Sequence, residues 1–110
     1  MRRKRYLYHV TDPRNMRSIR EKGLVRHANR PAIAVYLSES PMSWYREGLR
    51  ILRVDISGLS HIKATTFLPD SDEVLFWGDI PYWKSVKDGV CVARIKDVTD
   101  KYVKRSESDG

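Results

Sequence analysis

Residues 5–24, RYLYHVTDPRNMRSIREKGL, decide the fold, because they combine a strand, a polar turn and a capped helix in one short stretch. β-Forming side chains crowd residues 5–10 in a run too short for a helix, so we expect a strand there. Asp12 then offers a side-chain oxygen as N-cap, Pro13 suits the first helical position, and Gly23 can adopt the left-handed conformation that ends a helix. The stretch therefore predicts a strand followed directly by a helix.

The predicted helix has a narrow apolar stripe. Met16 and Ile19 are three residues apart and share one face, and we expect Leu24 to fold back onto them after the helix ends. The basic side chains of this helix stay in solvent, namely Arg14, Arg17, Arg20 and Lys22.

Length and composition indicate one folded domain over residues 1–110. Domains commonly have roughly 100–150 residues, and a 41% hydrophobic fraction is typical of a globular chain. We expect flexibility at residues 1–4 and 104–110, where charged and small residues dominate.

The net charge of +7 is large for a chain of this size. It favours a polyanionic partner such as nucleic acid or a phosphate-bearing ligand. A solvated basic surface that only keeps the protein soluble is the alternative, and the salt dependence of binding separates the two.

The number of cysteines and the hydropathy of the chain indicate the cellular compartment in which the protein is expected. Cys91 is the single cysteine, so one chain forms neither a disulfide nor a cysteine-based metal site, and a reducing cytoplasm fits. The basic start resembles that of a signal peptide, but His9, Thr11 and Asp12 interrupt the apolar region that should follow. No apolar run approaches the ~18 residues of a membrane span. We therefore expect a cytoplasmic protein without a metal and without a membrane partner.

The rest of the chain reads mainly as strands. Ser40 and Pro41 can begin a short helix that Gly48 ends, and residues 80–86 suit a turn or one helical turn. Phe76, Trp77 and Trp83 are expected to build the core. Further strands are expected over residues 32–38, 51–56, 62–67, 73–77 and 90–95, and around Tyr102 and Val103. One long helix against about six strands predicts an α+β domain with two small sheets.

Three separated segments carry a family resemblance. The first strand ends in His-x-Thr and leads through a capped helix to Gly-Leu; Val-Tyr-Leu-Ser follows; Asp-Glu-Val-Leu then opens a strand that precedes Ile-Pro. In this order they resemble the ADP-ribosyltransferase superfamily, in the branch with a His-Tyr-Glu triad that includes poly(ADP-ribose) polymerases and DNA-targeting bacterial toxins. The resemblance covers most of residues 6–81. It implies a small split β-sheet core with one main helix after the first strand, and NAD as substrate.

The resemblance implies roles for individual residues. His9 matches the family histidine that hydrogen-bonds the nicotinamide ribose, Tyr36 matches the triad tyrosine, and Glu73 matches the catalytic glutamate. Thr11 matches the small hydroxyl residue after the histidine, and Ser38 would lie close to the nicotinamide amide. Trp44 or Tyr45 would supply a second aromatic wall. The pyrophosphate would be neutralised by one of three arginines, Arg14, Arg30 or Arg53.

General chemistry is consistent with catalytic and binding roles for His9, Tyr36 and Glu73. Cleavage of the nicotinamide–ribose bond passes through an oxocarbenium-like state, which a nearby carboxylate stabilises, and an aromatic ring can stack on nicotinamide. Structural roles stand beside these: His9 and Tyr36 could be satisfied core residues, and Glu73 could be a solvent-facing strand start. Three other carboxylates compete with Glu73 for the catalytic role, namely Glu47, Asp70 and Asp72.

The sequence thus predicts an NAD-dependent mono-ADP-ribosyltransferase. Ser71 stands where arginine-specific and guanine-specific relatives carry a carboxylate or an amide, which disfavours protein arginine as the acceptor. Because basic residues flank the His9 strand, we expect a nucleic-acid acceptor, with a protein target as the alternative. Two other functions remain open: an NAD-dependent RNA 2′-phosphotransferase, and a non-catalytic basic module that binds nucleic acid or protein.

Overall fold

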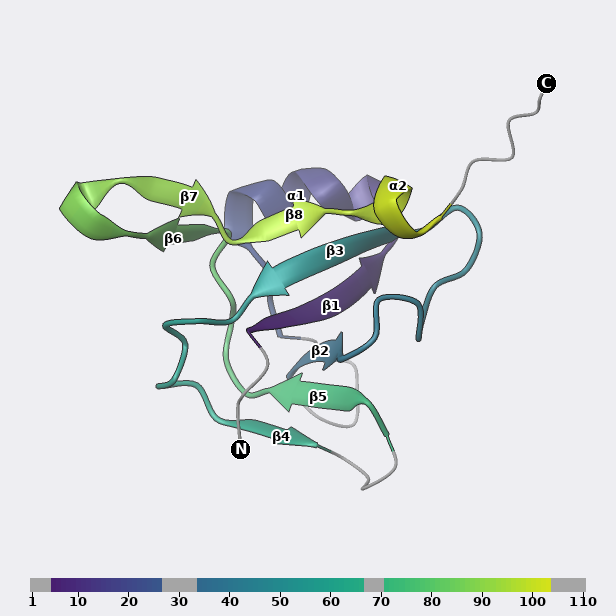
Figure 1. The fold of residues 1–110 in the computed structure, drawn as a ribbon, viewed down its shortest axis with the longest axis horizontal. Helices are drawn as coiled ribbons and strands as arrows, with labels where there is room; N and C mark the ends of the chain where they lie inside the picture. The colour runs from purple at the N-terminus through teal and green to yellow at the C-terminus, as the bar shows by residue number, and fades with distance from the viewer. Residues whose placement is uncertain (1–4, 27–33, 67–70, 104–110) are drawn as a thin grey trace.

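A six-stranded antiparallel sheet organises the residues that this computed structural model describes, which are 5–26, 34–66 and 71–103 (Figure 1). The strand order is β4-β5-β2-β1-β3-β8, and a separate two-stranded ribbon, β6-β7, projects beyond the sheet. The strands are β1 Tyr6–Thr11, β2 Val35–Ser38, β3 Arg50–Asp55, β4 Ala64–Thr66, β5 Glu73–Phe76, β6 Trp83–Ser85, β7 Cys91–Ala93 and β8 Ile95–Asp97. The helices are η1 Pro13–Asn15, α1 Met16–Lys22, η2 Lys87–Gly89 and α2 Thr99–Tyr102. The predicted α+β class, with one main helix after the first strand, is confirmed.

The sheet narrows between β1 and β2. β1 pairs with β3 along its whole length, and β2 pairs in the same way with β5. Between β1 and β2, the register within the described residues consists of the single pair Tyr8 and Ser38. The described residues thus form two sheets, as expected, but the two are unequal: the second is the ribbon β6-β7, and the first has six strands in the halves β8-β3-β1 and β2-β5-β4, which meet at a narrow join.

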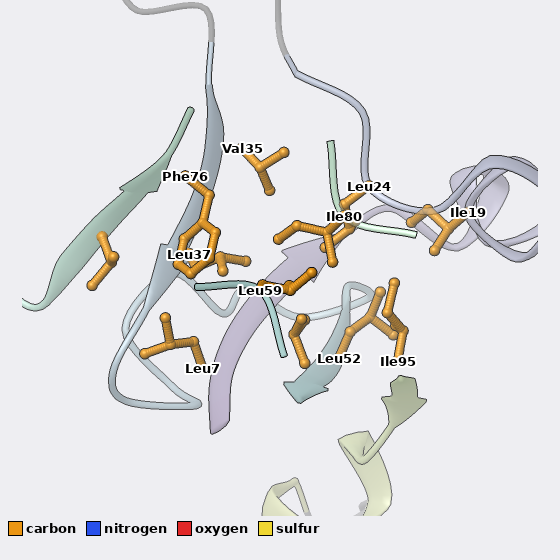
Figure 2. Packing of buried hydrophobic residues seen from close by; sticks show 12 residues of the cluster. Leu7, Ile19, Leu24, Val35, Leu37, Leu52, Leu59, Phe76, Ile80 and Ile95 are labelled. Atoms are coloured by element: carbon orange, nitrogen blue, oxygen red, sulfur yellow. The ribbon is translucent and has the colours of Figure 1, made fainter. Parts of the chain in front are cut away.

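The main core fills one face of both halves (Figure 2). Alternation along the strands directs Leu7, Leu37 and Leu52 to this face, where Ile19 of α1 packs against them. The remaining buried members come from both halves and from connecting segments: Leu24, Val35, Val54, Leu59, Val74, Phe76, Ile80 and Ile95. The core therefore holds the two halves together where their backbone pairing is sparse.

The helix begins as a tighter turn than the sequence predicts. Asp12 accepts a hydrogen bond from the Arg14 amide at 3.0 Å, as an N-cap should, but the first turn is 3₁₀ and α1 begins at Met16. Gly23 ends the helix at φ 76°. Leu24 then forms a backbone bridge with Ile80 through hydrogen bonds of 2.8 and 2.9 Å. This bridge brings the Gly-Leu segment against the Ile-Pro segment.

Residues 41–48 form turns, so the prediction of a short helix there was wrong. The carboxylate of Asp72 explains the difference, because it accepts hydrogen bonds from the Ser40 amide and from the Ser43 hydroxyl. The Glu39 amide also donates to the Asp72 carbonyl at 2.9 Å. These long-range contacts fasten the loop to the residue before β5 and replace a helical cap.

The second half of the chain differs more from the prediction. Residues 80–86 contain the strand β6, and residues 90–95 divide at Arg94 into β7 and β8. The chain passes from the ribbon to the sheet at Arg94, whose amide donates to the Tyr82 carbonyl at 2.7 Å and whose carbonyl accepts from the Asp55 amide at 3.0 Å. The last predicted strand, at residues 102–103, is wrong as well, because the short helix α2 ends there.

Two of the three aromatic residues assigned to the core are exposed. Phe76 is buried as predicted, whereas Trp77 and Trp83 are 40% and 57% exposed. Trp83 lies on the projecting ribbon, and the Trp77 indole donates to the Thr65 hydroxyl at 3.0 Å at the edge of the sheet. Neither position is covered by a second layer within the described residues.

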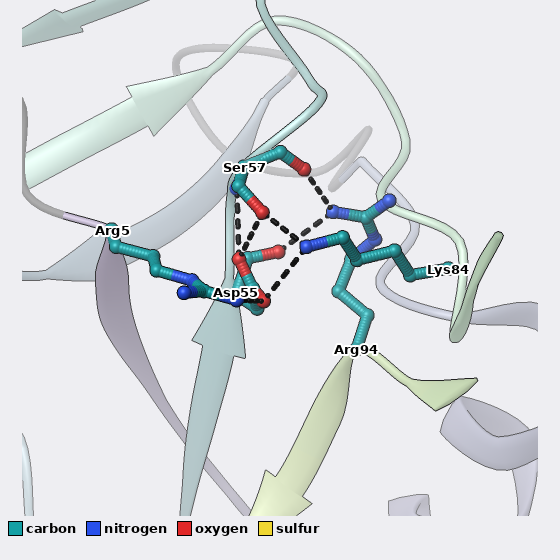
Figure 3. A network of polar contacts seen from close by, with 5 residues as sticks. All are labelled: Arg5, Asp55, Ser57, Lys84 and Arg94. Carbon is teal, nitrogen blue, oxygen red and sulfur yellow. Dashed lines mark hydrogen bonds and ion pairs between the residues drawn. The ribbon is translucent and has the colours of Figure 1, made fainter. Parts of the chain in front are cut away.

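A polar network fixes the base of the ribbon (Figure 3). The Asp55 carboxylate, at the end of β3, accepts hydrogen bonds from Arg5 at 3.2 Å and from Lys84 at 3.1 Å. Arg94 donates to the carbonyl oxygens of Asp55 and Ser57 at 2.7 and 2.9 Å. Burial alone would raise the pKa of Asp55, but the hydrogen bonds that the carboxyl accepts outweigh burial and hold its pKa well below the usual value.

Some expectations lie outside the described residues, namely the flexible ends at 1–4 and 104–110 and the start of the strand expected at 32–38. Among the helices that are described, none has both the length and the apolar character needed to cross a bilayer.

Candidate functional site

A cleft of about 330 Å³ opens where the sheet narrows between β1 and β2. It brings together the three triad residues that the sequence singles out: His9 from β1, Tyr36 from β2 and Glu73 from the start of β5. Ligand sites are commonly clefts of roughly 300–1,000 Å³ that contain a few converging polar groups. The cleft therefore has the size and the residue types of a small-molecule site.

His9 spans the split in the sheet. Its Nδ1 lies 2.9 Å from the carbonyl oxygen of Tyr36 on the neighbouring strand. Because a carbonyl oxygen only accepts hydrogen bonds, Nδ1 carries a proton and donates this bond; when the ring is neutral, Nε2 is the acceptor nitrogen. The bond fixes both the tautomer and the orientation of the imidazole.

Glu73 is held by the backbone at the first residue of β5. Its amide donates to the Ser71 hydroxyl at 3.0 Å. Tyr36 pairs with Leu75, and Glu73 lies two residues before Leu75 on the same strand, so the side chains of Tyr36 and Glu73 share one face of the sheet. The half-buried Glu73 carboxylate is thus placed on the side of the sheet that Tyr36 occupies.

Thr11 lines the cleft two residues after His9. The hydroxyl oxygen of this buried residue accepts a hydrogen bond from the Asn15 side chain at 3.1 Å, and Asn15 also lines the cleft. Asn15 was not singled out in the sequence, because an asparagine in the first turn after a strand carries no specific chemical signal.

Trp44 and Arg46 complete the cleft from the loop that follows β2. Of the two aromatic residues expected as a second wall, the structure thus places Trp44 at the cleft, whereas Tyr45 lines a separate cleft of about 670 Å³ beside Met16 and Arg50. Arg46 was missed, because nothing in its neighbourhood distinguishes it among the 21 lysines and arginines of the chain.

Besides Tyr45, two predicted binding residues do not line the cleft. Ser38 is fully buried, and its hydroxyl donates to the Ser40 carbonyl at 2.8 Å, so it supports the end of β2. The Arg14 side chain is 83% exposed and pairs with Asp12 at 3.4 Å, pointing into solvent. Of the other two candidate arginines, Arg53 stacks on Tyr6 at 4.5 Å, and Arg30 lies outside the described residues.

The competing carboxylates have other positions. Asp72 fastens the loop after β2, and Glu47 lines the second cleft beside Tyr45. Asp70 lies outside the described residues. Among the carboxylates that are described, Glu73 and Asp12 line the cleft with His9 and Tyr36, and the Asp12 carboxylate is already engaged as the N-cap that accepts from the Arg14 amide. Within the same residues, no group of three or more His, Cys, Asp and Glu side chains is arranged to hold a metal ion.

Comparisons with protein-family models, with curated proteins and with solved structures find no match to this chain. The motifs and the geometry of the cleft are therefore what indicates a function for this chain.

Proposed function

We propose that this protein is an NAD-dependent mono-ADP-ribosyltransferase that transfers ADP-ribose to a nucleic-acid or protein acceptor and releases nicotinamide. The observation that carries the proposal is the convergence of His9, Tyr36 and Glu73, from three different strands, on one cleft at the narrow join of the sheet. The segments that contain these residues are those that resemble the ADP-ribosyltransferase superfamily, and a sheet made of two halves agrees with the split sheet which that resemblance implies.

The cleft fits the nicotinamide end of NAD. Its volume of about 330 Å³ is at the lower end of the range for ligand sites, which suits one ring and a ribose. Tyr36 and Trp44 offer aromatic surfaces for a planar ring. Arg46 also lines the cleft, and the guanidinium of arginine is the group best matched to a diphosphate. We therefore assign the pyrophosphate to Arg46.

The chain's own residues supply the catalysis. The bond between C1′ of the NAD ribose and the pyridinium nitrogen breaks with its electron pair moving to nicotinamide, while an oxygen or nitrogen of the acceptor forms the new bond to C1′ and loses its proton to water. The Glu73 carboxylate stabilises the positive charge that develops on the ribose ring, as carboxylates do in glycosidases. His9, held by the Tyr36 carbonyl with Nε2 as acceptor, binds a ribose hydroxyl. Tyr36 and Trp44 hold the leaving ring.

Ser71, two residues before Glu73, bears on the choice of acceptor. The Ser71 hydroxyl is engaged by the Glu73 amide at 3.0 Å, and it has neither the carboxylate nor the amide that would position an arginine or a guanine. This contact gives Ser71 a structural role at the start of β5. Protein arginine is therefore disfavoured as the acceptor.

Release of nicotinamide from NAD tests the proposal. The wild type should release nicotinamide, and Glu73→Gln should lower the rate by roughly 100-fold, because it removes the charge that stabilises the transition state. Glu39→Gln is the matched control, since Glu39 is an exposed carboxylate at the end of β2 that does not line the cleft. NAD should also raise the melting temperature of both variants. Equal release by wild type and Glu73→Gln would refute the assignment.

A further inference from the structure

One face of the sheet half β8-β3-β1 is rich in tyrosine and basic residues. Leu7, Leu52 and Ile95 point into the core, so alternation directs Tyr6, Tyr8, Arg53 and Lys96 to the opposite face. Tyr8 is paired with Arg53, which is paired in turn with Lys96 on β8. Together with side chains at its two ends we call this surface the tyrosine–arginine face: Arg5, Tyr6, Tyr8, Arg53, Lys96, Lys101 and Tyr102.

The rings on this face are arranged in contact with cations. The guanidinium carbons of Arg5 and Arg53 lie 5.3 and 4.5 Å from the Tyr6 ring centre. At the other end, the Tyr8 and Tyr102 rings meet edge to face at 6.0 Å, and the Lys101 ammonium lies 5.6 Å from the Tyr102 ring. The face is thus a row of aromatic surfaces alternating with positive charge.

The electrostatics of the face favour a polyanion. Its strand carboxylate, Asp55, is already bonded by Arg5 and Lys84. Arg53, Lys96 and Lys101 form no ion pair with any residue that the structure describes. The hydrogen bond between the Tyr8 and Tyr102 hydroxyls raises the pKa of Tyr8 to about 12, so this ring adds no negative charge at neutral pH.

The tyrosine–arginine face is continuous with the candidate site, because Tyr8 also lines the cleft that contains His9 and Glu73. Proteins that bind single strands place bases on exposed aromatic rings and track the phosphates with basic side chains. We propose that single-stranded nucleic acid binds along the tyrosine–arginine face and is led from there into the cleft. Its role as the ADP-ribose acceptor rests on the proposed function, whereas the binding itself does not.

Binding of fluorescent oligonucleotides of about 12 nucleotides, without NAD, tests this proposal. Oligothymidylate and oligouridylate represent the two sugars, and a matched duplex tests the need for exposed bases. Both single strands should bind at least tenfold more tightly than the duplex. Equal binding of single strand and duplex would overturn the proposal, because stacking on Tyr6 and Tyr8 would then contribute nothing.

A charge-matched pair of double variants tests the location. Arg53→Gln with Lys96→Gln removes two charges from the face, and Arg17→Gln with Lys22→Gln removes two exposed charges from α1. The face variant should lower the slope of log K against log salt by about 1.4, since each phosphate contact on a single strand contributes about 0.7. The α1 variant should change it by less than half as much. Equal effects of the two variants would overturn the proposal.

Tyr6→Leu tests stacking and keeps a residue that is compatible with a strand. It should weaken single-strand binding roughly tenfold with a salt slope close to that of the wild type, because the lost contribution is not ionic. Unchanged affinity would refute a stacking role for this ring.

Failure of this proposal is distinguishable from failure of the proposed function. Absence of nicotinamide release with intact single-strand binding would refute the enzymatic activity. Intact release without single-strand binding would refute the tyrosine–arginine face as a binding surface.

Discussion

The substitution Gly23→Ala tests how the Gly-Leu segment is fixed against the rest of the domain. Gly23 has φ 76° and ψ −159°, a region of backbone space that is essentially restricted to glycine. A Cβ atom at this position would lie 2.1 Å from the Ile80 carbonyl oxygen and 2.9 Å from the Pro81 Cα. Both contacts are with backbone atoms, so no side-chain rotation relieves them.

The expected cost has two parts. The backbone conformation alone costs an alanine about 1–3 kcal/mol. Relief of the contact with Ile80 displaces its carbonyl and with it the Leu24–Ile80 bridge, whose two hydrogen bonds contribute about 0.5–1.5 kcal/mol each. We therefore expect Gly23→Ala to lower the free energy of unfolding by about 4 kcal/mol. At about 4–8 °C for each kcal/mol in a domain of this size, the melting temperature should fall by at least ~15 °C.

Gly58→Ala is the matched control for thermal and urea unfolding. Gly58 also has a positive φ, of 81°, but no heavy atom lies within 4 Å of a Cβ added there. It should therefore incur only the conformational part, about 1–3 kcal/mol, and keep the backbone contacts around it. If the two variants melted at the same temperature, the close approach of Gly23 to Ile80 would be refuted.

Three further predictions concern the polar network and the cleft. Because the folded-state pKa of Asp55 is depressed, its contribution to stability is complete above its unfolded pKa of about 3.9 and is lost as pH falls below about 4. Asp55→Asn should therefore lower the free energy of unfolding at pH 7 and flatten the acid limb of a curve of stability against pH. An unchanged acid limb would contradict the network. Arg46→Gln should raise the KM for NAD about tenfold, whereas Arg14→Gln should leave it unchanged; equal effects in steady-state kinetics would refute the assignment of the pyrophosphate. Trp44→Ala should weaken NAD binding by roughly tenfold in calorimetry, and Tyr45→Ala should not, since Tyr45 lines the other cleft; the reverse order would place the aromatic wall at Tyr45.

Local chemistry explains what the sequence predicts well. The cap at Asp12, the end of the helix at Gly23 and the alternation of Leu52 and Val54 depend on neighbouring residues, and each occurs where the sequence places it. His9 could be assigned to a strand end for the same reason. No local pattern relates residues as far apart as His9, Tyr36 and Glu73. The expectation that they share one site came instead from the order of three motifs and the family resemblance of those motifs.

Long-range contacts account for the rest. Residues 41–48 have a helix start signal, but Asp72 engages Ser40 and Ser43 and the segment forms turns. Trp83 belongs to a ribbon that separates from the sheet at Arg94, whose side chain donates to the Asp55 carbonyl at the end of β3, and this residue assigned to the core is exposed. Such partners are far apart in sequence, and hydrophobic pattern alone does not reveal them.

The most direct test of the central claim is an amide chemical-shift map of the isotopically labelled protein titrated with NAD. The proposed site predicts saturable changes that are largest at His9, Tyr36 and Glu73, and small changes on the β6-β7 ribbon, which lies outside the cleft. An absence of saturable changes at millimolar NAD, or changes centred on the ribbon, would contradict the assignment of the cleft as an NAD site.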